Sequence, residues 1–181
     1  MRTSRRLLHG IVAVLITMTA ALPTSLCAQE AAGIAMGAKA PGAAVQSLDG
    51  TAIDLRTFMN GKPVVLEFWA TWCPLCKQLE PAMQAARTRY ANEVRFVGVG
   101  VSTNQSAERQ RDFIAQRQMT GDYVFDNAGA AVAAYKVPHT SYVVVIDATG
   151  TVVYTGVGGT QDIDAAVRTA LRGRADSRGM H

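Results

Sequence analysis

The sequence predicts an α/β protein with a central mixed sheet, helices on both of its faces and an N-terminal β-hairpin. Three observations support this class. Apolar runs of strand length alternate with longer helical patterns, a pair of strands around a tight turn opens the alternation, and a second such pair comes near its end. The length of 181 residues suits one domain, and the 49% of hydrophobic residues can form its core without disulfide bonds.

The strands are predicted from short apolar runs that end at turn residues. They lie at 43–48, 52–55, 63–69, 94–101, 123–125, 142–146 and 151–157. The first two flank Asp49-Gly50, a dipeptide that favours the tight turn of a hairpin. The third, 63–69, is apolar on both faces, which is typical of a strand inside a covered sheet. The last two flank the turn at 147–150 and predict a closing hairpin.

The helices are predicted from longer segments between these strands. They lie at 56–60, 74–90, 106–119, 128–135 and 162–171. The first is a short turn that Gly61 closes. The second contains Pro81, which predicts a kink because proline cannot donate a backbone hydrogen bond. The third is amphipathic and places Phe113 and Ile114 on its inner face.

Residues 1–28 have the layout of a secretory signal peptide. Three arginines among the first six residues precede an apolar run at 7–22, and Ala28 offers a small residue for cleavage. The run is shorter than the ~20 residues of a membrane span. We therefore expect export to the periplasm or cell envelope, with no stable membrane insertion after signal removal. The alternatives are an uncleaved anchor and lipid attachment at Cys27, where the bulky Leu26 departs from the lipobox pattern.

Removal of the signal changes the charge and the cysteine content of the chain. Three of the 18 basic residues and none of the 14 acidic residues lie in it, so the formal charge falls from +4 to about +1. A chain so close to neutral gives no support for nucleic-acid binding. Beyond the signal we expect a linker at 29–39, one domain at 40–172 and a flexible C-terminal tail at 173–181.

The stretch Trp72-Cys73-Pro74-Leu75-Cys76 carries the chemistry. It follows a predicted buried strand and opens a predicted helix. Two cysteines at this spacing can form and break a disulfide. The helix dipole and the unpaired N–H groups of the first turn favour a thiolate there, and the thiolate is the attacking species in exchange. A structural zinc site would need two further ligands at metal spacing, which the sequence does not offer. The motif therefore predicts a redox enzyme.

Further segments extend the motif into a family pattern. They are Ala40-Pro41-Gly42, Asp49-Gly50, Gly61-Lys62-Pro63, Phe68-Trp69-Ala70-Thr71-Trp72-Cys73 and Val145-Ile146-Asp147. Together with the export signal they resemble the thioredoxin fold and, more narrowly, thiol–disulfide oxidoreductases of the TlpA/ResA type, over roughly residues 40–172. The resemblance implies exchange with the cysteines of protein substrates and no cofactor beyond a redox-active Cys73–Cys76 disulfide. It also implies a reductase supplied by a membrane electron donor, in cytochrome c maturation or a similar task, and general oxidation of secreted thiols is the alternative.

The resemblance also implies roles for the residues of the motif. Cys73, at the helix start where exposure is greatest, is the attacking nucleophile. Cys76, one turn into the helix and more buried, resolves the mixed disulfide. Pro74 has no N–H and cannot donate a hydrogen bond to the Cys73 sulfur. We expect Trp72 to cover part of the Cys73 surface and, with Pro74, to contact the substrate.

Glu67 is a lone carboxylate within an apolar strand, at a position that resembles the buried acid of thioredoxin. Burial raises the pKa of a carboxyl group, so Glu67 would exchange a proton with Cys76 near neutral pH. A solvent-facing Glu67 is the alternative. Glu80 is a rival on the helical face of Cys76, although the family carries its acid one position earlier, where this chain has Leu79.

The loop before residues 142–146 departs from the family pattern. Thioredoxin-like proteins place a cis-proline there, six residues before the aspartate that ends the strand. In this chain Ser141 occupies that position, and Pro138 lies three residues earlier. Either the docking loop is rebuilt around Pro138 or the cis-proline is missing. We expect a cis Val137–Pro138 peptide, with Pro138 near the substrate.

His139 raises a second function. The segment Val137-Pro138-His139-Thr140 resembles that of Sco-type copper proteins, in which a histidine joins two cysteines on the metal. Two thiolates and an imidazole suit copper, although Sco-type proteins space their cysteines CxxxC. Three interpretations of His139 remain: a loop residue that tunes the thiols or contacts substrate, a copper ligand with Cys73 and Cys76 in a metallochaperone, or an inert surface residue.

Overall fold

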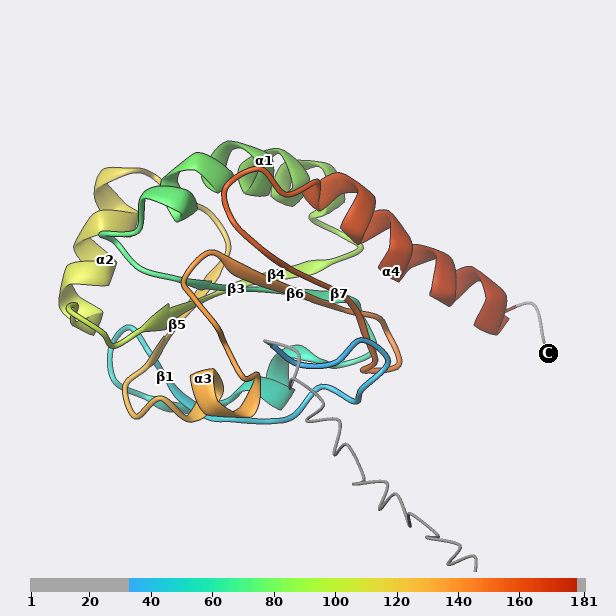
Figure 1. The fold of residues 1–181 in the computed structure, drawn as a ribbon, viewed down its shortest axis with the longest axis horizontal. Coiled ribbons are helices and arrows are strands. Elements are labelled where there is room, and N and C mark those ends of the chain that lie inside the picture. The colour runs from blue at the N-terminus through green and yellow to red at the C-terminus, as the bar shows by residue number, and fades with distance from the viewer. Residues whose placement is uncertain (1–32, 179–181) are drawn as a thin grey trace, which may run out of the picture. The chain divides into compact units, whose positions relative to one another are not determined.

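The computed structural model describes residues 33–178 (Figure 1). The predicted signal peptide at 1–28, with Cys27, lies outside the described residues, as do residues 179–181. Within the described part, no helix combines the length and the apolar character that a membrane crossing requires.

Seven strands form one sheet in the order β2-β1-β5-β4-β3-β6-β7. The strands are β1 (Ala44–Ser47), β2 (Ala52–Asp54), β3 (Val64–Trp69), β4 (Arg95–Val101), β5 (Asp122–Asp126), β6 (Tyr142–Ile146) and β7 (Val152–Val157). The helical elements are η1 (Leu55–Phe58), α1 (Pro74–Tyr90), α2 (Ala107–Gln116), α3 (Ala130–Ala134) and α4 (Ile163–Arg178).

The sheet is mixed, and β3 lies near its centre. This strand runs parallel to β4 and antiparallel to β6, and all six of its residues are buried. At the N-terminus β1 and β2 pair antiparallel around the turn that holds Gly50, whose φ of 94° is one that glycine tolerates. The predicted α/β class, the mixed sheet and both hairpins are therefore confirmed.

Helices cover both faces of the sheet, as predicted. Helices α1 and α4 lie over one face, whereas α3 and η1 lie over the other (Figure 1). Helix α2 contacts the α1 face, because the ring of Phe113 lies 5.9 Å from that of Trp69. On the opposite face Phe68 packs against Tyr135, which ends α3, at 5.4 Å. Alternate residues of β3 therefore face α1 or α3, and Glu67 and Trp69 share the α1 side.

The predicted boundaries differ most from the structure at the two ends of the domain. Residues 33–39 were expected to belong to a linker, yet they hydrogen-bond to the β6–β7 hairpin. The N–H of Gly37 donates to the Val152 carbonyl, and the N–H of Val152 donates to the Ala38 carbonyl. These bonds satisfy main-chain groups on the outer edge of β7, which would otherwise lack partners. At the other end, α4 continues to Arg178, past the predicted end at Leu171.

Candidate active site

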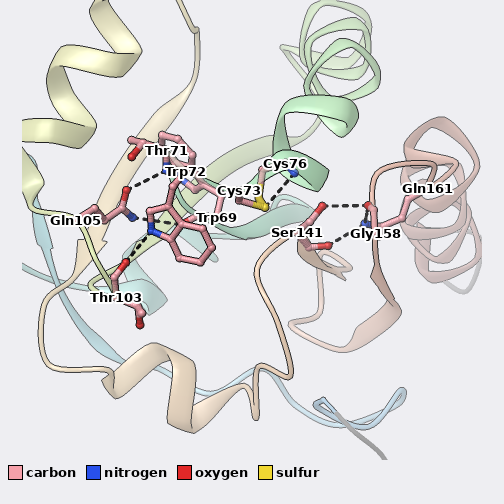
Figure 2. Close-up of a disulfide and its surroundings, with 10 residues drawn as sticks. All are labelled: Trp69, Thr71, Trp72, Cys73, Cys76, Thr103, Gln105, Ser141, Gly158 and Gln161. Carbon is pink, nitrogen blue, oxygen red and sulfur yellow. Dashed lines mark hydrogen bonds between the residues drawn. A yellow bond between two sulfur atoms is a disulfide. The ribbon is translucent and has the colours of Figure 1, made fainter.

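The two cysteines lie where β3 leads into α1. Cys73 is the N-cap of α1, with an extended backbone, and Pro74 follows at the first helical position, which suits proline. The two residues form a disulfide, with their Cα atoms 5.3 Å apart (Figure 2). The Cys73 Sγ accepts a hydrogen bond from the Cys76 N–H at 3.1 Å. The first turn of α1 therefore presents the Cys76 N–H to the sulfur that the sequence predicts to attack.

The exposure of the cysteines differs from the prediction. Cys73 was expected to be the exposed member of the pair, but it is 1% exposed and Cys76 is 5% exposed. In the disulfide form each sulfur is turned toward the other beneath the start of α1. The neighbouring Trp72 and Leu75 are 39% and 44% exposed. A partner would therefore meet an apolar surface before it reached the disulfide.

The segment before Cys73 is fixed by the loop that follows β4. The indole N–H of Trp72 donates to the Thr103 carbonyl at 2.8 Å, which holds the ring toward that loop (Figure 2). The Gln105 side chain accepts the Thr71 N–H at 3.0 Å and donates to the Val101 carbonyl at 2.6 Å. Sequence reasoning missed Gln105, whose only signal is an amide side chain soon after a buried strand.

Glu67 lies buried behind the disulfide on the α1 face of the sheet. Its side chain is 4% exposed, so the alternative of a solvent-facing residue is wrong. Burial raises the pKa of Glu67 from an ordinary 4.5 to about 8, although the positive charge of Arg87 acts in the opposite direction. Glu67 and Cys76 both line a cavity of about 20 Å³, which is enough for one water molecule. The carboxyl group and Cys76 therefore border one small cavity, and a water molecule in it would connect them.

Arg87 joins the two candidate acids and was not predicted. Its Nη1 donates to Glu80 at 2.9 Å, and its Nη2 lies 3.8 Å from Glu67. The Arg87 side chain is 5% exposed, and Nη2 has no hydrogen-bond partner in the described residues. Burial also raises the pKa of Glu80, against the charge of Arg87. The sequence signal was available, because Arg87 follows Glu80 by two helical turns and shares its face.

The loop before β6 has no cis-proline. The described residues contain no cis peptide bond, so the expected cis Val137–Pro138 peptide is wrong. Ser141 instead has a φ of 63°, in the left-handed region, and its N–H donates to the Phe68 carbonyl at 2.8 Å. That hydrogen bond extends the pairing of β6 with β3 and requires an N–H, which proline lacks. Pro138 lies three residues before Ser141 and takes no part in this contact.

The copper ligand set is not assembled. His139 is exposed in the loop before β6. Among the side chains that the structure describes, no three of His, Cys, Asp or Glu lie close enough together to hold a metal ion. The structure therefore does not bring His139 to Cys73 and Cys76, which form a disulfide with each other.

Comparison with known proteins fits this geometry. The family model described as Redoxin matches residues 35–171. The chain belongs to the Redoxin family. It is 32% identical over 127 residues to thioredoxin-like protein YneN of Bacillus subtilis. The aligned segment covers 70% of this chain and 74% of that protein. It is 27% identical over 118 residues to thiol-disulfide oxidoreductase ResA of Bacillus cereus. That alignment covers 65% of this chain and 67% of that protein.

Solved structures of similar proteins have the same fold as this chain. A thioredoxin-family thiol:disulfide interchange protein from Chlorobium tepidum matches 76% of the chain and 99% of its own, with a TM-score of 0.64 and 24% identity. A secreted Mycobacterium tuberculosis disulfide oxidoreductase, homologous to E. coli DsbE, matches 71% of this chain and 94% of its own, with a TM-score of 0.58 and 25% identity. The protein is thus a thiol–disulfide oxidoreductase with a thioredoxin fold.

Proposed function

We propose that this protein is exported and acts as a reductase of disulfides in other proteins. The observation that carries the proposal is a CxxC disulfide that caps α1 with a buried acid, Glu67, behind it. Cys73 is the attacking residue, Cys76 the resolving residue and Glu67 the proton acceptor. Trp72, Leu75 and Pro74 form the surface that a substrate meets.

The reaction begins with the reduced protein. The Cys73 thiolate attacks a substrate disulfide, a Cys73–substrate disulfide forms, and the other substrate sulfur leaves as a thiolate. Cys76 then gives its proton to Glu67 and attacks the Cys73 sulfur. The second substrate sulfur leaves, and the Cys73–Cys76 disulfide is the product. Two electrons pass to the substrate, and a donor dithiol must return them. During that return, protonated Glu67 supplies the proton that the leaving Cys76 thiolate takes up.

The hydrogen bonds of Cys73 favour the reducing direction. An oxidant of this chemistry depends on a strongly stabilised thiolate in its reduced form. Within residues 33–178 the Cys73 Sγ accepts one hydrogen bond, from the Cys76 N–H, and Pro74 has no N–H to add a second. One main-chain donor and the dipole of α1 stabilise a Cys73 thiolate less than a set of several donors would, which favours a reductant over a strong oxidant.

Export rests on the pattern of residues 1–28, and it determines what partners the reductase needs. An oxidising compartment would keep Cys73 and Cys76 as a disulfide, so a membrane partner must supply electrons. The cysteines of an exported apoprotein, as in cytochrome c maturation, are the substrate class that the family resemblance favours. Fractionation of cells that express the full chain tests this. A cytoplasmic protein of full length would refute the export proposal.

Titration of the purified protein against glutathione buffers tests the reducing direction. We expect a reduction potential close to that of thioredoxin, about −270 mV, and a value near −120 mV would make the protein an oxidant instead. Cys76→Ser should accumulate a mixed disulfide with substrate, because the resolving thiol is gone. Cys73→Ser should form none, and a trapped complex in that variant would reverse the two assignments.

The role of Glu67 has a separate test. Glu67→Gln cannot accept a proton, so it should slow release of the substrate from the mixed disulfide. The matched control is Glu93→Gln, at an exposed position after α1. Turnover of Glu67→Gln that equals that of the control between about pH 6 and pH 8 would remove Glu67 from the mechanism.

A further inference from the structure

The loop that carries Ser141 is tied to the turn between β7 and α4. The Ser141 carbonyl accepts the Gly158 N–H at 3.1 Å and the Gln161 side-chain amide at 3.0 Å. In return the Gly158 carbonyl accepts the Ser141 hydroxyl at 3.0 Å and the same Gln161 amide at 2.7 Å. Figure 2 shows these three residues on one side of the disulfide, opposite Trp72 and Gln105.

Gln161 is itself held in place from behind. The Tyr154 hydroxyl donates to the Gln161 side-chain oxygen at 3.2 Å, so the amide nitrogen is left to face the two carbonyls. Gly156 provides the space for this arrangement, because a Cβ atom there would collide with both the Tyr154 hydroxyl and the Gln161 oxygen. Residues of β7 therefore help to orient the amide toward the loop that it binds.

The Ser141 loop needs such support. A serine in the left-handed region is strained and persists only where its surroundings fix it. Ser141 is fully buried, so its carbonyl has no access to water and must find donors in the protein. Both donors come from the β7–α4 turn: one is the Gly158 N–H and the other is the Gln161 side-chain amide. The Gln161 amide also donates to the Gly158 carbonyl and so links the turn to the loop. A proline would fix the backbone by its ring, whereas here hydrogen bonds do so.

We propose that Gln161 is the positioning residue of the substrate-docking loop, and that it does the work for which the family uses a cis-proline. Gln161 does not touch the sulfur atoms in this role. It sets the path of the loop beside the disulfide, and so affects substrates large enough to contact the loop. The inference rests on the proposed function, because it assumes exchange with protein disulfides.

Two disulfide substrates of different size provide the test. The reduced full chain is mixed in single turnover with insulin, a protein large enough to contact the loop, and with bis(hydroxyethyl) disulfide, which is too small to need it. In Gln161→Leu we expect the rate constant for insulin to fall about tenfold, since the Ser141 and Gly158 carbonyls lose a donor. The rate constant for the small disulfide should stay within about twofold of wild type, because Cys73 and Cys76 are untouched. Gln116→Leu, at the exposed end of α2, is the matched control.

Each result decides the matter. Equal loss with both substrates would overturn the inference, because the damage would then lie at the cysteines or in the whole fold. No loss with either substrate would overturn it as well. If Gln161→Leu fails to fold, Gln161→Asn, whose amide is one methylene short of the carbonyls, is judged by the same two rates. Hydrogen exchange of the Gly158 N–H should accelerate in either variant. Wild-type protein that is inactive toward both disulfides would instead refute the proposed function.

Discussion

Replacement of Glu67 should change how the stability of the oxidised protein depends on pH. Burial raises the pKa of Glu67 from 4.5 to about 8. Between these values the folded protein holds a proton that the unfolded chain has released, so the free energy of unfolding falls as the pH rises. The stabilisation is complete below about pH 4.5 and is lost by about pH 8. The two pKa values differ by about 3.5, and each pKa unit corresponds to about 1.4 kcal/mol. Protonated Glu67 therefore contributes up to about 5 kcal/mol to the free energy of unfolding.

Glu67→Gln mimics the protonated carboxyl group and cannot lose a proton. Its free energy of unfolding should therefore lack the slope, which in wild type approaches about 1.4 kcal/mol per pH unit. Urea denaturation of the disulfide form between about pH 5 and pH 8 measures both slopes. Glu93→Gln should follow wild type, because that residue is exposed. Equal slopes in wild type and Glu67→Gln would show that Glu67 titrates like an exposed residue, and the argument from burial would fail.

Three shorter predictions concern the loops around the disulfide. Ser141→Pro should lower the free energy of unfolding by about 3 kcal/mol or more in urea, because proline cannot adopt a φ of 63° or donate to Phe68; unchanged stability would contradict this. Gln105→Ala should cost about 1–3 kcal/mol and alter Trp72 fluorescence, since buried main-chain groups lose their partner; a silent variant would make the contact incidental. His139→Ala should leave competitive Cu(I) binding by the reduced protein unchanged, and a collapse of tight binding would restore the copper hypothesis.

The parts of the fold that the sequence predicted well are those that local signals determine. Helix α1 begins at Pro74 and ends at Tyr90, as predicted, because Cys73 caps its start and Pro74 occupies the first helical position, which suits proline. Strand β6 also has its predicted bounds, since 142–146 is a continuous apolar run between turn residues. The burial of Glu67 was implied by the resemblance to the buried acid of thioredoxin, and it agrees with the prediction that both faces of β3 are covered.

The predictions that failed concern features that depend on contacts between distant segments. The exposure of Cys73 was judged from its place at a helix start, but the disulfide turns its sulfur inward. The conformation of Ser141 depends on Gln161, twenty residues later, and no local sequence pattern predicts that contact. The position of Pro138 suggested a cis peptide by analogy alone, whereas the pairing of Ser141 with Phe68 made one unnecessary.

The buried Arg87 explains how one site can hold a neutral acid and still use it as a base. In the disulfide form Glu67 is neutral near pH 7, and Arg87 is paired with Glu80 at 2.9 Å, so the buried group carries little net charge. When Glu67 gives its proton to the departing Cys76 thiolate, a new negative charge appears on the carboxyl group. The Arg87 Nη2, 3.8 Å away and without a hydrogen-bond partner in the described residues, is placed to meet it. Desolvation alone would make that charge prohibitive, and the guanidinium lowers its cost without keeping Glu67 ionised beforehand. Burial raises the pKa of Glu67 and the charge of Arg87 lowers it, so the two effects together leave that pKa near neutral pH. Proton exchange with Cys76 in both directions requires a pKa in this range.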